Sequence, residues 1–139
     1  MSVLKALTVL NGGAVNKIYL SLLFLVGVIN FLPIVGILSL DKINQAYGLS
    51  IDDNNLAILL RHRALLFGLI GGFVIYSVFN PQYQIASIVL AAISMLGYLY
   101  FFWSIGDSNP ALLKIAQADI VGIVLLTFAI LIKCFLNDS

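Results

Sequence analysis

The chain has 139 residues, of which 62% are hydrophobic and 9% are Asp, Glu, Lys or Arg, and its formal net charge at pH 7 is +1. A water-soluble domain needs a polar surface that this composition cannot supply, so the composition predicts an integral membrane protein. The small net charge and the lack of a basic cluster argue against a nucleic-acid partner, and the single cysteine, Cys134, excludes an internal disulfide.

The first apolar stretch predicts a membrane-spanning helix over about residues 17–40, because roughly 20 helical residues cross a hydrocarbon core of about 30 Å. Before this stretch, Asn11-Gly12-Gly13 has the composition of a turn. Pro33 predicts a kink within the span, since proline removes a backbone donor. Asn30, one turn earlier, can donate a hydrogen bond to a freed carbonyl or to a neighbouring helix.

Residues 41–55 make up the longest polar loop, and mixed apolar and polar residues within it predict a short surface helix ending at Gly48. The second span is predicted over about residues 54–79. It starts near Asp53, because acidic side chains favour the positive end of a helix dipole. It ends before Pro81.

Arg61, His62 and Arg63 lie near the start of this second span. At about 100° per residue, Arg61 shares a face with Gly68 and Gly72, whose spacing lets membrane helices approach closely. We therefore predict that this face packs against the bundle and carries Arg61 inward. Arg63 is expected either to reach the lipid headgroups or to replace Arg61 if the helix is rotated.

The third span is predicted over about residues 83–103, joined to the second by a tight turn, and Gly97 belongs to its predicted packing face. The fourth span covers about residues 111–135, with Asn109 as the predicted N-cap. Asp119 lies just inside the hydrocarbon. Placing an ionisable group at that depth costs more free energy than placing any other residue of the chain. Such a group usually faces the bundle and has a partner.

Because successive spans run in opposite directions, Arg61 and Asp119 come to the same membrane face at similar depth. We predict an Arg61 to Asp119 ion pair, with Arg63 as the substitute and with His62 and Asn30 nearby. Two interpretations remain open. The pair fixes helix packing, or it forms a polar site whose donors bind a headgroup, a carboxylate or a quinone carbonyl.

Familiar catalytic patterns are missing from the sequence. It has no glycine-rich phosphate loop after a strand, no cysteine pair and only one histidine. We therefore predict no catalytic residue and no metal site, and we do not expect this chain alone to be an enzyme.

The order of three motifs resembles the small four-span bacterial DoxX-like membrane proteins. The motifs are Gly27-x-x-Asn30-x-Leu32-Pro33, then Leu60-Arg61-His62-Arg63-Ala64-x-x-Phe67-Gly68, then Ala118-Asp119. The resemblance implies a four-helix bundle in a bacterial inner membrane, with Arg61, Arg63 and Asp119 as family positions. In some relatives it implies a complex subunit linked to quinone-coupled oxidation. Similar small proteins sometimes carry a phosphopantetheine adenylyltransferase name, and the residues around His62 give that activity no support.

The sequence thus predicts an all-α, four-helix transmembrane protein with residues 1–139 as one domain. Its expected function is that of a non-catalytic accessory subunit or partner of a larger inner-membrane complex or homo-oligomer, surrounded by membrane lipids. The alternatives are a lipid- or quinone-binding protein associated with an oxidoreductase, without another cofactor, and a small oligomeric transporter. The lysines and arginines divide three against four between the two membrane faces, and the count reverses if both arginines belong to the site. Because the second face also carries five of the six aspartates, we expect cytoplasmic termini.

Overall fold

The computed structural model describes residues 3–50, 52–106 and 109–138, and within these ranges the regular secondary structure is entirely helical, which confirms the predicted fold class. Four helical segments are long and apolar enough to cross a membrane. The elements in chain order are α1 (Val3–Phe31), the 3₁₀ segment η1 (Leu32–Ile37), α2 (Leu40–Tyr47), α3 (Asn54–Phe79), the 3₁₀ segment η2 (Pro81–Tyr83), α4 (Gln84–Ile105) and α5 (Pro110–Asp138).

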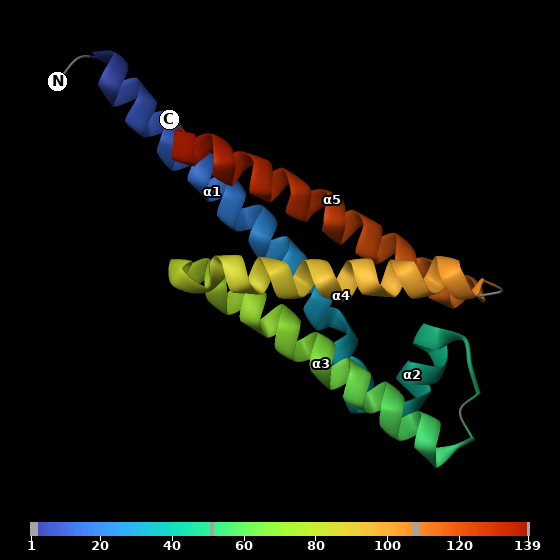
Figure 1. Cartoon of the computed structure of the whole chain (residues 1–139). Helices are drawn as coiled ribbons and strands as arrows, with labels where there is room; N and C mark the ends of the chain where they lie inside the picture. Colours follow the sequence, from blue (N-terminus) through green and yellow to red (C-terminus); the bar gives the residue numbers. More distant parts are fainter. Residues whose placement is uncertain (1–2, 51, 107–108, 139) are drawn as a thin grey trace.

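The four long helices are arranged so that each packs mainly against two neighbours, and α1 also touches α4. Helix α1 packs against α3 and α5, and α4 packs against the same two helices from the other side. Figure 1 shows the start of α1 and the end of α5 lying together at one end of the bundle, and α2 lying at the opposite end. We call these the η2 end and the α2 end, because η2 and α2 belong to them.

The outward surface of the bundle is apolar. Large hydrophobic side chains on three spanning helices, Leu69, Ile93 and Leu131 among them, are more than half exposed. In water these side chains would be unfavourable, but hydrocarbon solvates them well. The exposed surface is therefore that of a multi-pass membrane protein.

Helix α1 begins earlier than the sequence predicted. It continues through Asn11, Gly12 and Gly13, where we expected a turn. Two glycines weaken a helix by about 1 kcal/mol each, which a long helix can absorb. Next to a membrane, breaking the helix would also leave backbone donors and acceptors without partners, so continuing it is favourable.

Pro33 ends the regular part of α1, as the predicted kink requires. The chain passes from α1 into η1, with Pro33 in the first turn of the 3₁₀ segment. It then enters α2, whose C-cap Gly48 has a φ of 61°, a left-handed conformation that glycine adopts without strain. The prediction of a short helix ending at Gly48 is confirmed.

The helix starts at the α2 end are capped as predicted. Asp53 caps α3, and its carboxylate accepts a hydrogen bond from the Asn55 backbone N–H at 2.9 Å. Asn109 accepts from the Leu112 backbone N–H at 3.0 Å, at the start of α5. The Asn109 side-chain amide also donates to the Tyr47 carbonyl at 2.6 Å, which ties the end of α2 to the start of α5.

The closest helix crossing lies between α1 and α3, at Gly27 and Gly71. A Cβ atom at Gly71 would overlap the Phe31 backbone and the Gly27 carbonyl, so the two backbones touch. Gly68 is also buried, against the Ile34 side chain. Gly72 is only half-buried, and a Cβ there would meet nothing nearer than the Phe31 ring at 3.8 Å. The crossing face therefore contains Gly68 and Gly71 instead of the predicted Gly68 and Gly72.

Gly97 in α4 has open space around it, with nothing within 4 Å of a Cβ at that position. The buried residues of α4 after Ala91 are Met95 and Leu99, each four positions beyond the last. Gly97 lies about half a turn from that line, so the predicted packing role of Gly97 is wrong.

The η2 end of the bundle contains a buried network of polar side chains. The Tyr19 hydroxyl donates to Gln84 Oε1 at 2.9 Å, and Gln84 Nε2 donates to the Ser77 carbonyl at 3.2 Å. The Ser87 hydroxyl donates to Ser77 Oγ at 2.8 Å. Each of these buried side chains has a partner, so the network joins α1, α3 and α4 and leaves no open group for a ligand.

We predict that Gly71→Ala lowers the free energy of unfolding by about 1–3 kcal/mol, because the new methyl group would meet backbone atoms that cannot move independently. Gly72→Ala is the matched control, since its methyl group has room and alanine favours helix more than glycine does. Thermal unfolding in detergent measures both variants. Equal stability of the two would contradict the assigned crossing face.

We also predict that Tyr19→Phe destabilises the protein by about 1–3 kcal/mol, because Gln84 Oε1 would lose its donor in a buried position. Tyr76, which is half exposed, supplies the control substitution Tyr76→Phe, for which little change is expected. A denaturation series in detergent distinguishes the two, and an unchanged Tyr19→Phe variant would show that the network adds no stability.

Candidate ligand-binding site

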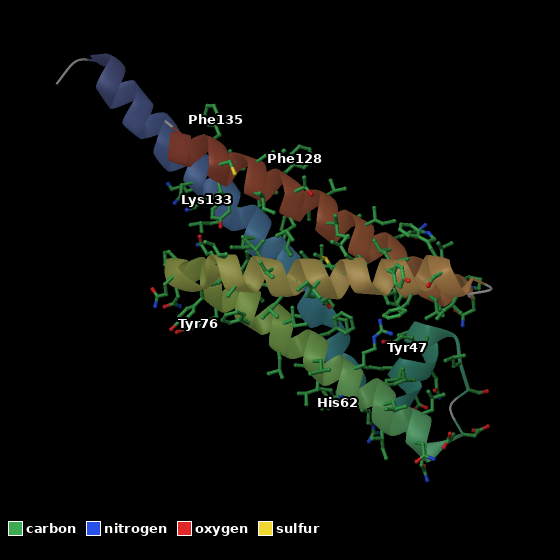
Figure 2. All side chains as sticks on the ribbon, viewed as in Figure 1. Tyr47, His62, Tyr76, Phe128, Lys133 and Phe135 are labelled. Atoms are coloured by element: carbon green, nitrogen blue, oxygen red, sulfur yellow. The ribbon has the colours of Figure 1, made fainter. Side chains whose placement is uncertain are left out.

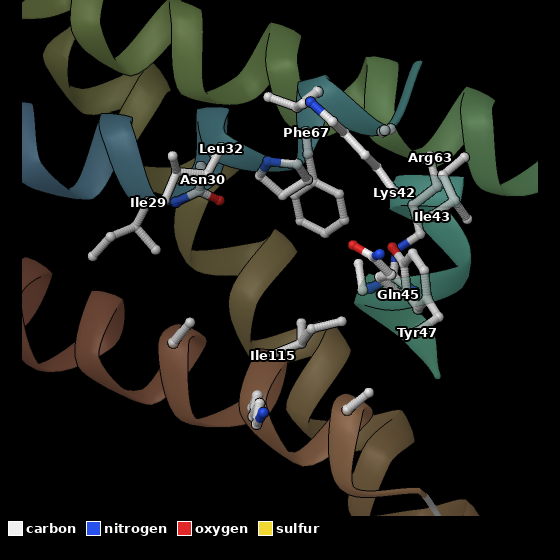
Figure 3. Close-up of a pocket in the computed structure, with 18 of the residues that line it drawn as sticks. Ile29, Asn30, Leu32, Lys42, Ile43, Gln45, Tyr47, Arg63, Phe67 and Ile115 are labelled. Carbon is white, nitrogen blue, oxygen red and sulfur yellow. The ribbon is translucent and has the colours of Figure 1, made fainter. Parts of the chain in front are cut away.

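A cavity of about 490 Å³ lies at the α2 end of the bundle, among α1, η1, α2, α3 and α5. Most of its wall is apolar, with Leu32, Phe67 and Ile115 contributing side chains. Figure 3 shows Asn30 toward one end of the cavity and Gln45, Tyr47 and Arg63 toward the other. The cavity forms where α1 stops and η1 turns away, because from that point α1 no longer fills the space between α3 and α5.

Arg63 is the cation that enters this cavity from α3, and it is half-buried. Its guanidinium carbon lies 4.8 Å from the Tyr98 ring centroid, 5.1 Å from that of Phe67 and 5.5 Å from that of Tyr47. These rings come from α4, α3 and α2. Attraction between a cation and the face of an aromatic ring therefore holds the guanidinium in place and ties α2 to the bundle.

Asp119 enters the cavity from α5, and its side chain is 6% exposed. Its Oδ2 atom is buried and accepts no hydrogen bond. Asp119 interacts electrostatically with Arg63, but among the residues that the structure describes no ion pair joins the two. A buried carboxylate oxygen without a donor is energetically costly, especially inside a membrane span.

Asn30 supplies a second unpartnered acceptor. The residue is 2% exposed, and its Oδ1 atom accepts no hydrogen bond. Its amide nitrogen is already used, because it donates to the Val26 carbonyl at 3.0 Å and approaches Met95 Sδ at 3.6 Å. The donor contacts fix which end of the amide is oxygen, so Oδ1 is the atom that lacks a partner.

Asn30 and Asp119 lie on adjacent parts of α1 and α5. A Cβ at Gly122, one turn beyond Asp119, would contact Met95 Sδ, the atom that Asn30 approaches, and would lie 3.8 Å from Ile29. Asp119 and Arg63 are each nine residues beyond the first residue of their helices, which corresponds to about 14 Å along each helix. The three polar side chains therefore reach similar depth in the membrane.

Arg61 and His62 do not take part in this cavity. Both are exposed, and Figure 2 shows His62 on the outer side of α3, away from the other helices. The predicted Arg61 to Asp119 pair is therefore wrong, and Arg63, the stated substitute, is the arginine that lies in the cavity with Asp119. The error follows from treating the crossing with α1 as the only packed side of α3. Arg63 lies on a side of α3 that Tyr47 of α2 and Tyr98 of α4 cover, whereas Arg61 is exposed.

Several cavity residues were not identified from the sequence. Tyr47, Phe67 and Tyr98 surround Arg63, and Lys42 and Lys114 line the part of the cavity formed by α2 and the start of α5. One signal was available, because Phe67 is four residues after Arg63 and such a pair lies on the same face of a helix. The contacts of Arg63 with Tyr47 and Tyr98 join separate helices, and no spacing in the sequence reports them.

The cavity therefore offers two kinds of hydrogen-bonding group at once. Asp119 Oδ2 and Asn30 Oδ1 can accept. The Arg63 guanidinium, which lies over aromatic rings and makes no hydrogen bond in the described part of the chain, can donate. An apolar wall surrounds both. Such a combination of a concave apolar surface with a few open polar groups is typical of small-molecule binding sites.

Comparisons of the chain with protein-family models, with curated proteins and with solved structures find no match. The resemblance to the DoxX-like proteins accordingly stays a prediction.

We predict that Asp119→Leu raises the free energy of unfolding of the ligand-free protein by about 1–3 kcal/mol, because it replaces a buried, unpartnered charge with an apolar group that the adjacent cavity can accommodate. Asp41→Leu is the control, since Asp41 is exposed in the first turn of α2. Thermal unfolding of the delipidated protein tests this. A loss of stability in Asp119→Leu would show that the carboxylate makes a stabilising interaction within the chain.

Proposed function

We propose that this protein binds a small amphipathic molecule from the bilayer in the cavity at the α2 end. The observation that carries the proposal is the cavity itself, in which two buried acceptor atoms and an arginine over aromatic rings have no hydrogen-bond partner among the described residues. A site with a purely structural role would pair Arg63 with Asp119. Here Arg63 and Asp119 line the same apolar cavity without pairing.

The location of the cavity supports a ligand drawn from the membrane. Asn30, Arg63 and Asp119 each lie well inside a spanning segment, so the polar end of the ligand would be held below the membrane surface. The apolar wall, which includes Leu32 and Ile115, suits an apolar portion of the ligand. A lipid and a quinone both have this general form.

A role as accessory subunit of a larger complex is retained as a second candidate, as is assembly into homo-oligomers. The exposed apolar side chains of the spanning helices fit a partner protein as well as they fit lipid, so they favour neither. Transport by an oligomer is less supported, because the open polar groups lie at one end of the bundle while the η2 end is closed by the satisfied Tyr19 and Gln84 network.

We further propose a bacterial inner-membrane location with both termini in the cytoplasm. The support for the location is the resemblance to DoxX-like proteins. The support for the orientation is that five of the six aspartates belong to the α2 end, while the lysines and arginines divide three against four between the two ends. A reporter fused after Ser139 would read cytoplasmic under this proposal, and a periplasmic signal would reverse the assigned orientation.

We predict that gentle extraction of the native protein yields a retained small amphiphile, and that Arg63→Gln lowers its occupancy about tenfold, because the variant loses a charged donor at the site. Arg61→Gln is the matched control, since it makes the same change on the same helix outside the cavity. Mass spectrometry of organic extracts, normalised to protein, measures the occupancy. An identical lipid complement in the wild type and both variants would contradict the proposed function.

A further inference from the structure

The cavity contains groups of opposite charge that are not paired with one another. The Arg63 guanidinium lies against aromatic rings, and Asp119 Oδ2 accepts no hydrogen bond. A ligand with a single charge would leave either the cation or the carboxylate unmatched in an apolar environment. A ligand that carries both charges would match the two groups together.

The acceptor side of the cavity indicates which cation fits. Asp119 Oδ2 and Asn30 Oδ1 are both buried, and both need a donor. A primary ammonium has three N–H donors, so one such group can satisfy both oxygens, and its charge compensates that of the carboxylate. A trimethylammonium group has the charge but no N–H donor. A hydroxyl group has one O–H donor and no charge.

The donor side indicates an anion. The Arg63 guanidinium lies over the faces of aromatic rings, and its N–H donors make no hydrogen bond in the described part of the chain. The edge of a guanidinium matches the two oxygens of a carboxylate or phosphate. Lys42 and Lys114, which also line the cavity, add positive charge to it.

We propose that the cavity selects a zwitterion with a primary ammonium and an attached apolar body. The ammonium would bind Asp119 and Asn30, and a carboxylate or phosphate would bind Arg63. This inference rests on the proposed binding function and narrows its ligand class. Two sources supply this chemistry, the phosphoethanolamine headgroup of a membrane lipid and a free amino acid with an apolar side chain.

The first arm of the test uses lipids that differ only in the headgroup. The full chain in detergent is titrated with phosphatidylethanolamine, phosphatidylcholine and phosphatidylglycerol of identical acyl chains, and bound lipid is counted by native mass spectrometry. If the lipid is the source, we expect phosphatidylethanolamine to bind about tenfold or more tightly than phosphatidylcholine, because only the former has N–H donors for the two oxygens.

The second arm uses water-soluble probes. Phenylalanine is compared with N-acetylphenylalanine, which keeps the carboxylate and the ring but lacks the ammonium, and thermal unfolding reports binding through a rise in the melting temperature. If a free amino acid is the source, we expect only phenylalanine to raise the melting temperature. A response confined to one arm identifies the source.

A pair of variants tests the assigned contacts in whichever arm responds. Asp119→Asn keeps the size of the side chain and removes its charge, so the preference for the primary ammonium should fall about fivefold or more. Asp41→Asn removes an exposed carboxylate outside the cavity and should leave the preference unchanged. If Asp119→Asn fails to fold, the comparisons of lipids and of phenylalanine probes with the wild-type protein still test the proposal.

The outcomes separate the two levels of the proposal. Stronger binding of phosphatidylglycerol, equal binding of phosphatidylcholine, or binding of a neutral quinone in place of any zwitterion would overturn the zwitterion assignment and leave the binding function in place. If no lipid, quinone or amino acid binds above the level of Arg63→Gln, both the assignment and the binding function are overturned.

Discussion

Every polar group inside a membrane span must find its hydrogen-bond partner within the protein, because hydrocarbon offers none. The η2 end meets this requirement, since Tyr19, Ser77, Gln84 and Ser87 bond to one another across three helices. The α2 end does not meet this requirement, because among the described residues the buried Asn30 Oδ1 and Asp119 Oδ2 atoms lack a hydrogen-bond partner. One bundle therefore has a closed end that contributes rigidity and an open end whose polar groups are free for a ligand.

The open end results from the point where α1 stops. Pro33 cannot continue the hydrogen-bonding pattern of an α-helix, so η1 leads the chain away from the space between α3 and α5. Helix α2 then covers that space, held by the bond from Asn109 to the Tyr47 carbonyl and by the contact of the Tyr47 ring with Arg63. The end of α1 thus creates the cavity, and α2 keeps the cavity narrow.

Composition and helix periodicity were sufficient to predict the four spans, the short helix ending at Gly48 and the inward position of Asp119, because each depends on local hydrophobicity or on a single capping residue. Choosing between Arg61 and Arg63 required the contacts of α3 with α2 and α4, whose Tyr47 and Tyr98 rings lie against Arg63. The choice of crossing face also required packing information. Gly68 forms an acceptable small-residue face with either Gly71 or Gly72, and only the contact of Gly71 with Phe31 and Gly27 decides between them. That contact depends on packing between helices, which periodicity within one helix does not report.

The position of Arg63 explains how a protein can keep opposite charges in one cavity without their pairing. The Arg63 guanidinium lies over the rings of Tyr47, Phe67 and Tyr98. This attraction competes with the movement that would bring Arg63 onto Asp119. In the described part of the chain the guanidinium makes no hydrogen bond. A side chain already held in position loses little conformational freedom when a ligand binds, so more of the interaction energy appears as affinity. The rings therefore contribute to binding without contacting the charged atoms of a ligand, by keeping the donor and the acceptors separate and ready.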